Sequence, residues 1–346
     1  MRASRRGFSP LVYALMALFT FAVLVVCVSV GSVRVPLRDT LRVVFSAVFH
    51  TPVPEDVAFP TIISAVRLPR VLCVALVGAA LSLCGGAMQG LLKNPLADGS
   101  TLGVSSGASL GAVIAIAFGV SFPALPFAGT VAMAMLFAFA SLLIILGLAY
   151  RLDFSLSTNT IILIGVVYSM FVSSAMNIVV TFASDRVKQI TFWTMGSLSG
   201  STYENAAALA AALVVFGGGI FLRAEELNAF AVGEENARHL GVNVRGTKLA
   251  VLICVSGLIG VCVSIGGTIG FVGLVTPHIA RLIVGPNHRR LLPACAFGGA
   301  AFLMLSDLAA RTLLSPLELP IGVVTSLIGA VLFVYIYASS RRKGHA

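Results

Sequence analysis

The chain has 346 residues, of which 58% are hydrophobic and only 10% are charged, and its mean hydropathy is +1.02. Soluble domains carry roughly 25% charged residues, so this composition excludes an ordinary soluble protein and indicates an all-α, polytopic membrane protein. The net charge of +10 does not indicate a nucleic-acid partner, because the basic residues lie at the ends of apolar runs and form no patch with interleaved aromatic residues.

Apolar runs of about 20 residues are long enough to cross the roughly 30 Å hydrocarbon layer of a bilayer. The first run is longer than the roughly 7–15-residue core of a cleaved signal peptide, so we predict a retained span. The sequence predicts about ten transmembrane segments in a single transmembrane domain, 1–346, at 11–31, 69–91, 101–119, 124–149, 158–182, 204–222, 247–266, 277–284, 289–312 and 320–338. Segment 101–119 is short and rich in glycine, and segment 277–284, which begins at Pro277, is predicted to be a half-span. The proline-rich connection after the first span is predicted to be an extracytoplasmic loop.

The positions of Lys and Arg predict the orientation of these spans. With the N-terminus in the cytoplasm, 15 of the 23 Lys and Arg residues fall inside and eight fall outside. This bias predicts that both termini are cytoplasmic and that the segment 223–248 is cytoplasmic too. A group of basic residues before the second span, which includes Arg67 and Arg70, falls outside and is not explained by the preference of Lys and Arg for the cytoplasmic side.

The segment 223–248 is rich in charged residues and lies between two apolar spans. From Gly233 to Gly241 it has acidic residues first and basic residues last, which matches the dipole of a short helix that Gly241 would end. Leu227 and Phe230 give the preceding stretch an apolar face. We therefore predict two short helices joined at Gly233 that form a surface for a partner, with a solvated loop as the alternative.

Small residues recur at intervals of four in the second and third spans, where they allow neighbouring helices to approach closely. This pattern favours helix packing over pore lining. The residues concerned are Ser82, Gly86, Gly90, Gly103, Gly107 and Gly111. The six cysteines all lie inside apolar runs and are interpreted as small buried hydrophobic residues.

Neither a catalytic nor a metal-binding signature is found, so we predict no catalytic residue, no metal site and no directly bound cofactor. The stretch from Gly241 to Lys248 resembles a phosphate-binding loop, but its Lys is displaced and no strand precedes it, so it is not expected to bind ATP. His278 is interpreted as a capping or packing residue. Asp307 and Arg311 are four residues apart on one predicted helix and are expected to pair.

Six motifs, in order, make the chain similar to permease subunits of the FecCD type, which belong to ABC importers of ferric siderophores, haem and cobalamin. They are RLPR at 67–70 and the stretches 78–109, 192–200, 227–242, 267–285 and 318–333. The resemblance implies ten helices per subunit, a second permease subunit (identical or different), two cytoplasmic ATPases that use the ATP, and an extracytoplasmic substrate-binding protein. It also implies a multi-pass location in the bacterial cytoplasmic (inner) membrane.

The resemblance also implies roles for particular residues. The ATPase-coupling residues would be Leu227, Phe230, Gly233, Glu234, Glu235, Arg238, Leu240 and Gly241. The cytoplasmic gate would contain Asn94, Leu96, Thr158 and Asn159, although Lys93 and Asn159 depart from cobalamin permeases. Arg67 and Arg311 would meet acidic residues of the binding protein.

The sequence therefore predicts a permease that moves an iron chelate, with a ferric siderophore favoured over haem or cobalamin. The alternative from another class is an ion-coupled secondary transporter, which needs a carboxylate near mid-membrane. Asp307 is the sole candidate, and the nearby Arg311 makes it a poor one. An intramembrane enzyme would need a nucleophile and base, and no such constellation is present.

Overall fold

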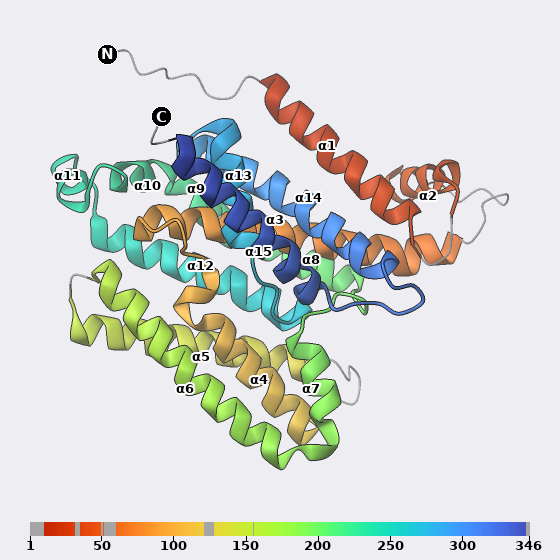
Figure 1. Ribbon diagram of the computed structural model, residues 1–346, viewed down its shortest axis with the longest axis horizontal. Helices are drawn as coiled ribbons and strands as arrows, with labels where there is room; N and C mark the ends of the chain where they lie inside the picture. The colour runs from red at the N-terminus through yellow and green to blue at the C-terminus, as the bar shows by residue number, and fades with distance from the viewer. Residues whose placement is uncertain are drawn as a thin grey trace.

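The computed structural model describes residues 10–31, 35–49, 51, 60–120, 128–154 and 156–343, and these are organised as packed helices without strands (Figure 1). Seven helices are long and apolar enough to cross a membrane, and three further apolar helices are shorter. Together they correspond to the ten predicted segments, and the predicted all-α polytopic architecture is confirmed.

Nine of these segments are single helices: α1 (Pro10–Ser29), α3 (Leu68–Leu92), α4 (Val104–Phe118), α5 (Ala128–Leu152), α6 (Thr158–Phe182), α12 (Val244–Gly266), α13 (Val272–Val284), α14 (His288–Thr312) and α15 (Ile321–Lys343). The span at 203–222 is divided into α8 (Tyr203–Ala212), a π-helical turn (Leu213–Gly217) and α9 (Gly218–Leu222). Another π-helical turn, Ile62–Arg67, leads directly into α3. The shorter helices α2 (Leu37–Phe49), α7 (Val187–Thr194), α10 (Ala224–Phe230) and α11 (Glu234–His239) lie outside the spans.

Helix α3 lies at the centre of the bundle. In its most apolar window 78% of the residues are buried, against 22% for α1 and α6. Its glycines allow this position because a Cβ atom at Gly78 or Gly85 would overlap the backbone carbonyl oxygen of Gly299 on α14 or Gly273 on α13. The backbone of α3 is therefore in direct contact with the backbones of α14 and α13, as small residues permit in membrane helices.

The predicted stripes of small residues lie in such contacts. A Cβ atom at Gly86 would meet Cys295, and one at Gly90 would overlap the ring of His288. On α4, Gly107 and Gly111 lie equally close to α5. The packing interpretation of the two stripes is therefore supported.

The predicted start of the half-span at Pro277 is wrong, because α13 begins five residues earlier, at Val272. A proline inside a helix removes a backbone donor and leaves a carbonyl four residues before it without its usual partner. Here that carbonyl belongs to Gly273, and the side-chain amide of Gln89 on α3 donates to it at 3.4 Å and to the carbonyl of Leu274 at 3.3 Å. A neighbouring helix thus supplies the hydrogen bond that the proline cannot make.

The connection after α1 is also more ordered than the predicted loop, because it contains α2. Leu37, Leu41 and Phe45 lie four residues apart on this helix and are all exposed, while Arg38 and Arg42 alternate with them. An amphipathic helix of this kind has no long apolar run, so a search for spans by hydropathy overlooks it.

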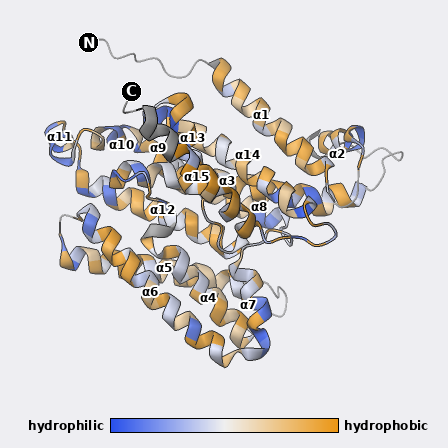
Figure 2. Cartoon of the chain, viewed as in Figure 1, coloured by the Kyte–Doolittle hydropathy of each residue, from blue (hydrophilic) through white to orange (hydrophobic). Residues whose placement is uncertain are grey.

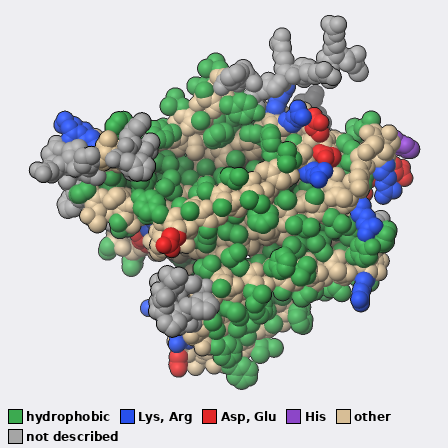
Figure 3. All heavy atoms as spheres, turned by 180° about the vertical axis from the view of Figure 1, so that it is seen from behind, with side chains coloured by type: hydrophobic (Ala, Val, Ile, Leu, Met, Phe, Trp, Pro, Cys, Tyr) green, Lys and Arg blue, Asp and Glu red, His purple; other side chains and the backbone are tan. Residues whose placement is uncertain are grey.

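The polar elements gather at the two ends of the bundle. Figure 2 shows α10 and α11 at one end and α2 at the other, with mainly apolar helices between them. Seen from behind, the surface is largely hydrophobic, and most charged side chains lie near the margins of the view (Figure 3). Met16 near the start of α1 packs on a cluster with Val284 and Leu291, so the start of α1 lies at the α10 end.

Candidate functional site

The segment 223–248, called here the coupling segment, folds as predicted into two short helices. Helix α10 ends at Phe230 and α11 begins at Glu234. Gly233 between them has φ = 112° and Gly241 after α11 has φ = 85°, backbone conformations that a residue with a side chain rarely adopts. Glu234 and Glu235 occupy the first turn of α11 and Arg238 and His239 its last turn, which suits the helix dipole.

Helix α10 anchors the coupling segment to the bundle. The side chains of Leu227 and Phe230 are fully buried. The side-chain oxygen of Asn228 accepts hydrogen bonds from the backbone N–H of His288 at 2.7 Å and lies 2.9 Å from Nδ1 of its ring. The amide nitrogen of Asn228 donates to Asn287 at 3.3 Å. These contacts tie α10 to the first turn of α14.

Helix α11 carries the accessible part of the predicted coupling surface. Glu235, Arg238 and Gly241 are exposed, and Leu240 is 70% exposed. Of the eight predicted coupling residues, Leu227 and Phe230 on α10 therefore face the bundle, whereas Glu235, Arg238, Leu240 and Gly241, on α11 or directly after it, face outward. The outward set combines one acid, one base and one apolar side chain that a partner can contact.

Glu234 differs from Glu235 because it faces a buried cation. Its carboxylate lies 2.9 Å from Nζ of Lys248, a side chain with no exposed surface at the start of α12. The same Nζ donates to the backbone carbonyl of Leu156 at 2.8 Å. Leu156 belongs to the turn between α5 and α6 and has φ = 52°. One ammonium group thus joins the coupling segment to that turn.

A second cation of α12 holds the same turn. The guanidinium carbon of Arg245 lies 4.6 Å from the ring centre of Tyr150 and 3.9 Å from that of Phe154. Both distances lie within the roughly 6 Å range of cation–π attraction. The turn after α5 is therefore clamped on the first turn of α12.

The four predicted gate residues lie on two turns. Oδ1 of Asn94 accepts the backbone N–H of Leu96 at 2.9 Å, and Leu96 is 50% exposed. Thr158 and Asn159 form the first turn of α6, where Thr158 is half-buried and Asn159 is exposed. Figure 1 places both turns toward the α10–α11 end of the bundle.

The start of α6 is held by a capping network that the sequence analysis did not identify. The side-chain oxygen of Ser157 caps the helix by accepting from the N–H of Thr160 at 3.4 Å. Oδ2 of Asp153 accepts from the N–H of Ser157 at 3.0 Å and from the hydroxyl of Thr160 at 3.1 Å. These bonds fix the direction in which Thr158 and Asn159 leave the turn.

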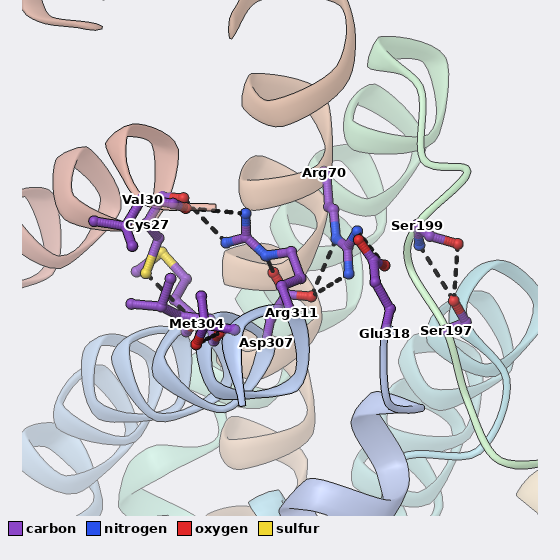
Figure 4. Close-up of polar contacts among 11 residues, drawn as sticks. Cys27, Val30, Arg70, Ser197, Ser199, Met304, Asp307, Arg311 and Glu318 are labelled. Atoms are coloured by element: carbon purple, nitrogen blue, oxygen red, sulfur yellow. Dashed lines mark hydrogen bonds and ion pairs between the residues drawn. The ribbon is translucent and has the colours of Figure 1, made fainter. Parts of the chain in front are cut away.

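At the opposite end, four buried charges and the exposed Glu318 form what we call the arginine cluster: Arg67, Arg70, Asp307, Arg311 and Glu318. The predicted pair is confirmed, with Nε of Arg311 2.9 Å from Oδ2 of Asp307. Arg70 places Nε and Nη2 on Oδ1 of the same carboxylate at 3.1 and 3.0 Å, and its Nη1 reaches Glu318 at 2.9 Å (Figure 4). A buried carboxylate between two arginines is occupied on both oxygens, which makes Asp307 a poor carrier of a coupling ion.

The two arginines predicted to meet the binding protein are each only 5% exposed. Nη1 of Arg67 donates to the carbonyls of Val28 and Ser29 at 3.1 and 3.0 Å. Nη2 of Arg311 donates to the carbonyl of Cys27 at 3.0 Å. Both arginines therefore hold the end of α1. Their docking role stays a prediction.

A cavity of about 280 Å³ lies between α3, α4, α12 and the segment after α12. Its polar lining includes Asp98, Ser105, Ser109, Thr194 and Thr268. Sites for drug-sized ligands span roughly 300–1,000 Å³, so this cavity is below that range.

Sequence reasoning missed several residues of these sites, among them Arg70, Lys248 and Asp153. Each is a charged residue at the very end of a span. The signal for Lys248 is its position inside the first turns of an apolar helix, where a charge needs a partner. Its partners, however, lie 14 and 92 residues away, a relation that no local pattern contains.

Comparison with known proteins gives consistent matches. The model of the FecCD transport family matches residues 18–339. The ABC transporter permease protein YvrB of Bacillus subtilis is 40% identical over 320 residues, covering 92% of this chain and 91% of the relative. The hemin transport system permease protein HmuU of Yersinia pestis is 39% identical, covering 80% and 83%. The vitamin B12 import system permease protein BtuC of Citrobacter koseri is 40% identical with the same coverages, 80% and 83%.

Among solved structures, an inward-facing conformation of a metal-chelate type ABC transporter has a TM-score of 0.82 and is 30% identical in sequence. The match covers 96% of this chain and all of that one. The similarity thus extends over the whole bundle, including the coupling segment and the arginine cluster.

Proposed function

Because this chain belongs to the FecCD transport family of ABC transporter permeases, we propose that it is the membrane-spanning subunit of an ATP-driven importer that carries a metal chelate into the cytoplasm. The observation that carries the proposal is the family match over residues 18–339, together with an apolar bundle that presents α11 at one end. The proposed location is the bacterial cytoplasmic membrane, with both termini and the coupling segment inside.

In this proposal the chain makes and breaks no bond. ATP hydrolysis takes place in two separate cytoplasmic ATPase subunits that hold Glu235, Arg238 and Leu240. Movement of α11 then changes the tilt of the helices whose first or last turns carry the gate residues. The buried side chains of Leu227 and Phe230 make α10 move with the bundle instead of sliding over it.

A second permease subunit, identical or different, completes the path. The cavity of about 280 Å³ within one chain is slightly below the roughly 300–1,000 Å³ of sites for drug-sized ligands, which favours a path for larger chelates between two subunits. The exposed apolar faces of α6 and α15 offer surfaces for such a subunit or for lipid, with Met170, Phe171, Val331 and Val334 each at least 67% exposed. An extracytoplasmic binding protein is proposed to deliver the chelate near Arg67 and Arg311.

For the substrate we propose a ferric siderophore, and haemin and cobalamin are the other chelates to test. The relatives HmuU and BtuC are named for hemin and vitamin B12, so these compounds belong in the same experiment. Discrimination among the three is assigned to the binding protein.

Uptake into proteoliposomes tests the proposal. The permease would be reconstituted with its ATPases and binding protein, ATP enclosed on the ATPase side, and a radiolabelled ferric siderophore, haemin or cobalamin supplied outside. We expect uptake of one chelate that requires ATP and persists with protonophores and sodium ionophores. Uptake that needs an ion gradient and proceeds without the ATPases would overturn the proposal and favour a secondary transporter.

A further inference from the structure

Lys248 is the most deeply buried ion-paired cation of the coupling segment, and it contacts two elements that the proposed function assigns to different tasks. Its ammonium group lies 2.9 Å from Glu234 on α11 and 2.8 Å from the carbonyl of Leu156 in the turn before α6. Leu156 precedes the predicted gate residue Thr158 by two positions. The path from α11 to the gate turn therefore consists of one ion pair and one hydrogen bond.

The buried environment of Lys248 strengthens both of its contacts. Its side chain has no exposed surface, so the ammonium group is shielded from bulk water, while the side chain of Glu234 is 29% exposed. A hydrogen bond from a charged donor is roughly twice as strong as a neutral one, and low local polarity strengthens it further. If Glu234 moves, the ammonium group has to follow it or become a buried cation that has lost its counter-ion.

The described residues of the turn that receives this contact are held at three points. Leu156 holds a left-handed backbone conformation, Arg245 stacks on Phe154, and Asp153 caps the first turn of α6. A pull on the Leu156 carbonyl therefore moves the turn and the start of α6 together.

We propose that Lys248 is the positioning residue that transmits movement of α11 to the gate turn at the start of α6, through its contacts with Glu234 and the Leu156 carbonyl. This inference rests on the proposed function, since it assigns the connection between the ATPase-coupling surface and the gate. Lys248 itself touches neither ATP nor the chelate.

Two substitutions test the connection at its two contacts. Lys248→Met keeps the length of the side chain but removes both contacts, whereas Glu234→Gln weakens only the contact with α11 and leaves Lys248 on the Leu156 carbonyl. Both would be measured in the complete reconstituted complex as molecules of chelate taken up per ATP hydrolysed. Couplings between distant sites typically correspond to 5–150-fold effects, so we expect this ratio to fall at least about fivefold while ATP hydrolysis continues.

The matched control is Arg289→Met. It removes an ion pair of similar length between Arg289 and Glu225, 2.8 Å, whose side chains are 65% and 67% exposed. The uptake ratio of this variant should equal that of the unsubstituted complex. Lys248→Arg, which keeps a buried donor, should recover part of the ratio that Lys248→Met loses.

A spin-label measurement separates transmission from a merely structural role. Labels at Asn159 and at a site on α12 would report how far the start of α6 moves when nucleotide binds. We expect the nucleotide-dependent change to become smaller in Glu234→Gln, a milder substitution that retains the buried cation and should still assemble if Lys248→Met does not.

The outcomes distinguish this inference from the proposed function. If the unsubstituted complex shows no ATP-driven uptake, the proposed function fails. If that complex is coupled and Glu234→Gln keeps both its uptake ratio and its nucleotide-dependent movement at Asn159, the role assigned to Lys248 is wrong.

Discussion

At the scale of single residues, the packing of α3 depends on the absence of side-chain atoms. A methyl group at Gly85 would occupy the space of the Gly273 carbonyl oxygen, and backbone cannot move aside as the end of a flexible side chain can. Such contacts explain why the small residues could be identified from the sequence but their partners could not. The spacing marks a face of one helix, whereas the partner helix is 188 residues further along the chain, a relation set by the fold.

Gly85→Ala should therefore destabilise the bundle. Overpacking a tight interior typically costs about 1–3 kcal/mol, and here α3 and α13 would have to separate. We expect a lower midpoint of thermal unfolding in detergent and a lower yield of monodisperse protein. Gly147→Ala on α5 is the control, because nothing lies within 4 Å of its Cβ position, and it should leave the midpoint equal or slightly higher. Equal midpoints for Gly85→Ala and the unsubstituted protein would contradict this account.

The arginine cluster shows what a local pattern contains and what it omits. The pairing of Asp307 with Arg311 follows from their separation of four residues on one helix, and it is present. Arg70 is hydrogen-bonded to the same carboxylate, but it lies 237 residues away in the chain and was not identified. Sequence reasoning therefore found half of a buried charge network.

At the scale of elements, run length and capping residues predict most helices well. The predicted bounds of 158–182 agree with α6 in every residue, because Ser157 caps its start and the apolar run ends with the helix. The prediction fails where tertiary contacts decide. Helix α13 continues through Pro277 because Gln89 replaces the missing bond, and α2 forms without a long apolar run.

The coupling segment was predicted as two helices, but its inward and outward sides were not. Leu227 and Phe230 anchor α10, and Glu234 is bound to Lys248, so the surface available to an ATPase is on α11. The sequence could not assign these sides because both faces of such short helices carry residues that could contact a partner. Only the positions of α14 and α12 decide which face is covered.

Reversing the charge of Glu235 should therefore disrupt the ATPase contact. Glu235→Arg places a cation in the first turn of an exposed helix, against the helix dipole and against a partner adapted to an acid. We expect at least about tenfold weaker association with the ATPase subunits and a matching loss of uptake, measured by co-purification and in proteoliposomes. Glu204→Arg, at an acid that is also exposed in the first turn of α8, is the control and should change neither. Normal association of Glu235→Arg would rule out this face of α11 as the docking surface.

At the scale of the whole molecule, the two arginines predicted to meet the binding protein have structural contacts. Arg67 and Arg311 hold carbonyls at the end of α1, so charge reversal at either would also disturb the fold. A neutral substitution at Arg67 is the sharper test, because Arg67 is not the partner of Asp307 in the pairs described above.

Arg67→Gln should weaken capture of the binding protein by roughly tenfold or more, the effect expected when one side of a close interfacial charge pair of about 1.5–7 kcal/mol is removed. Capture would be measured by surface-immobilised binding protein and purified complex, with size-exclusion profiles establishing that assembly is intact. Arg186→Gln, an arginine at the start of α7 whose side chain is exposed, serves as the control. Unchanged capture with intact assembly would leave Arg67 with its structural role alone.

The long separations within the arginine cluster and at Gln89 have a consequence for biosynthesis. Gln89 and Arg70 leave the ribosome 184 and 237 residues before Gly273 and Asp307, their partners in the finished bundle. At about 5–20 residues per second, Arg70 waits roughly 10–50 s for its carboxylate. During that time α3 has been synthesised with an unpaired guanidinium and amide, although it is the helix on which the others later assemble. We expect α3 to remain beside the insertion machinery until α14 emerges, so that the central helix is released into lipid among the last.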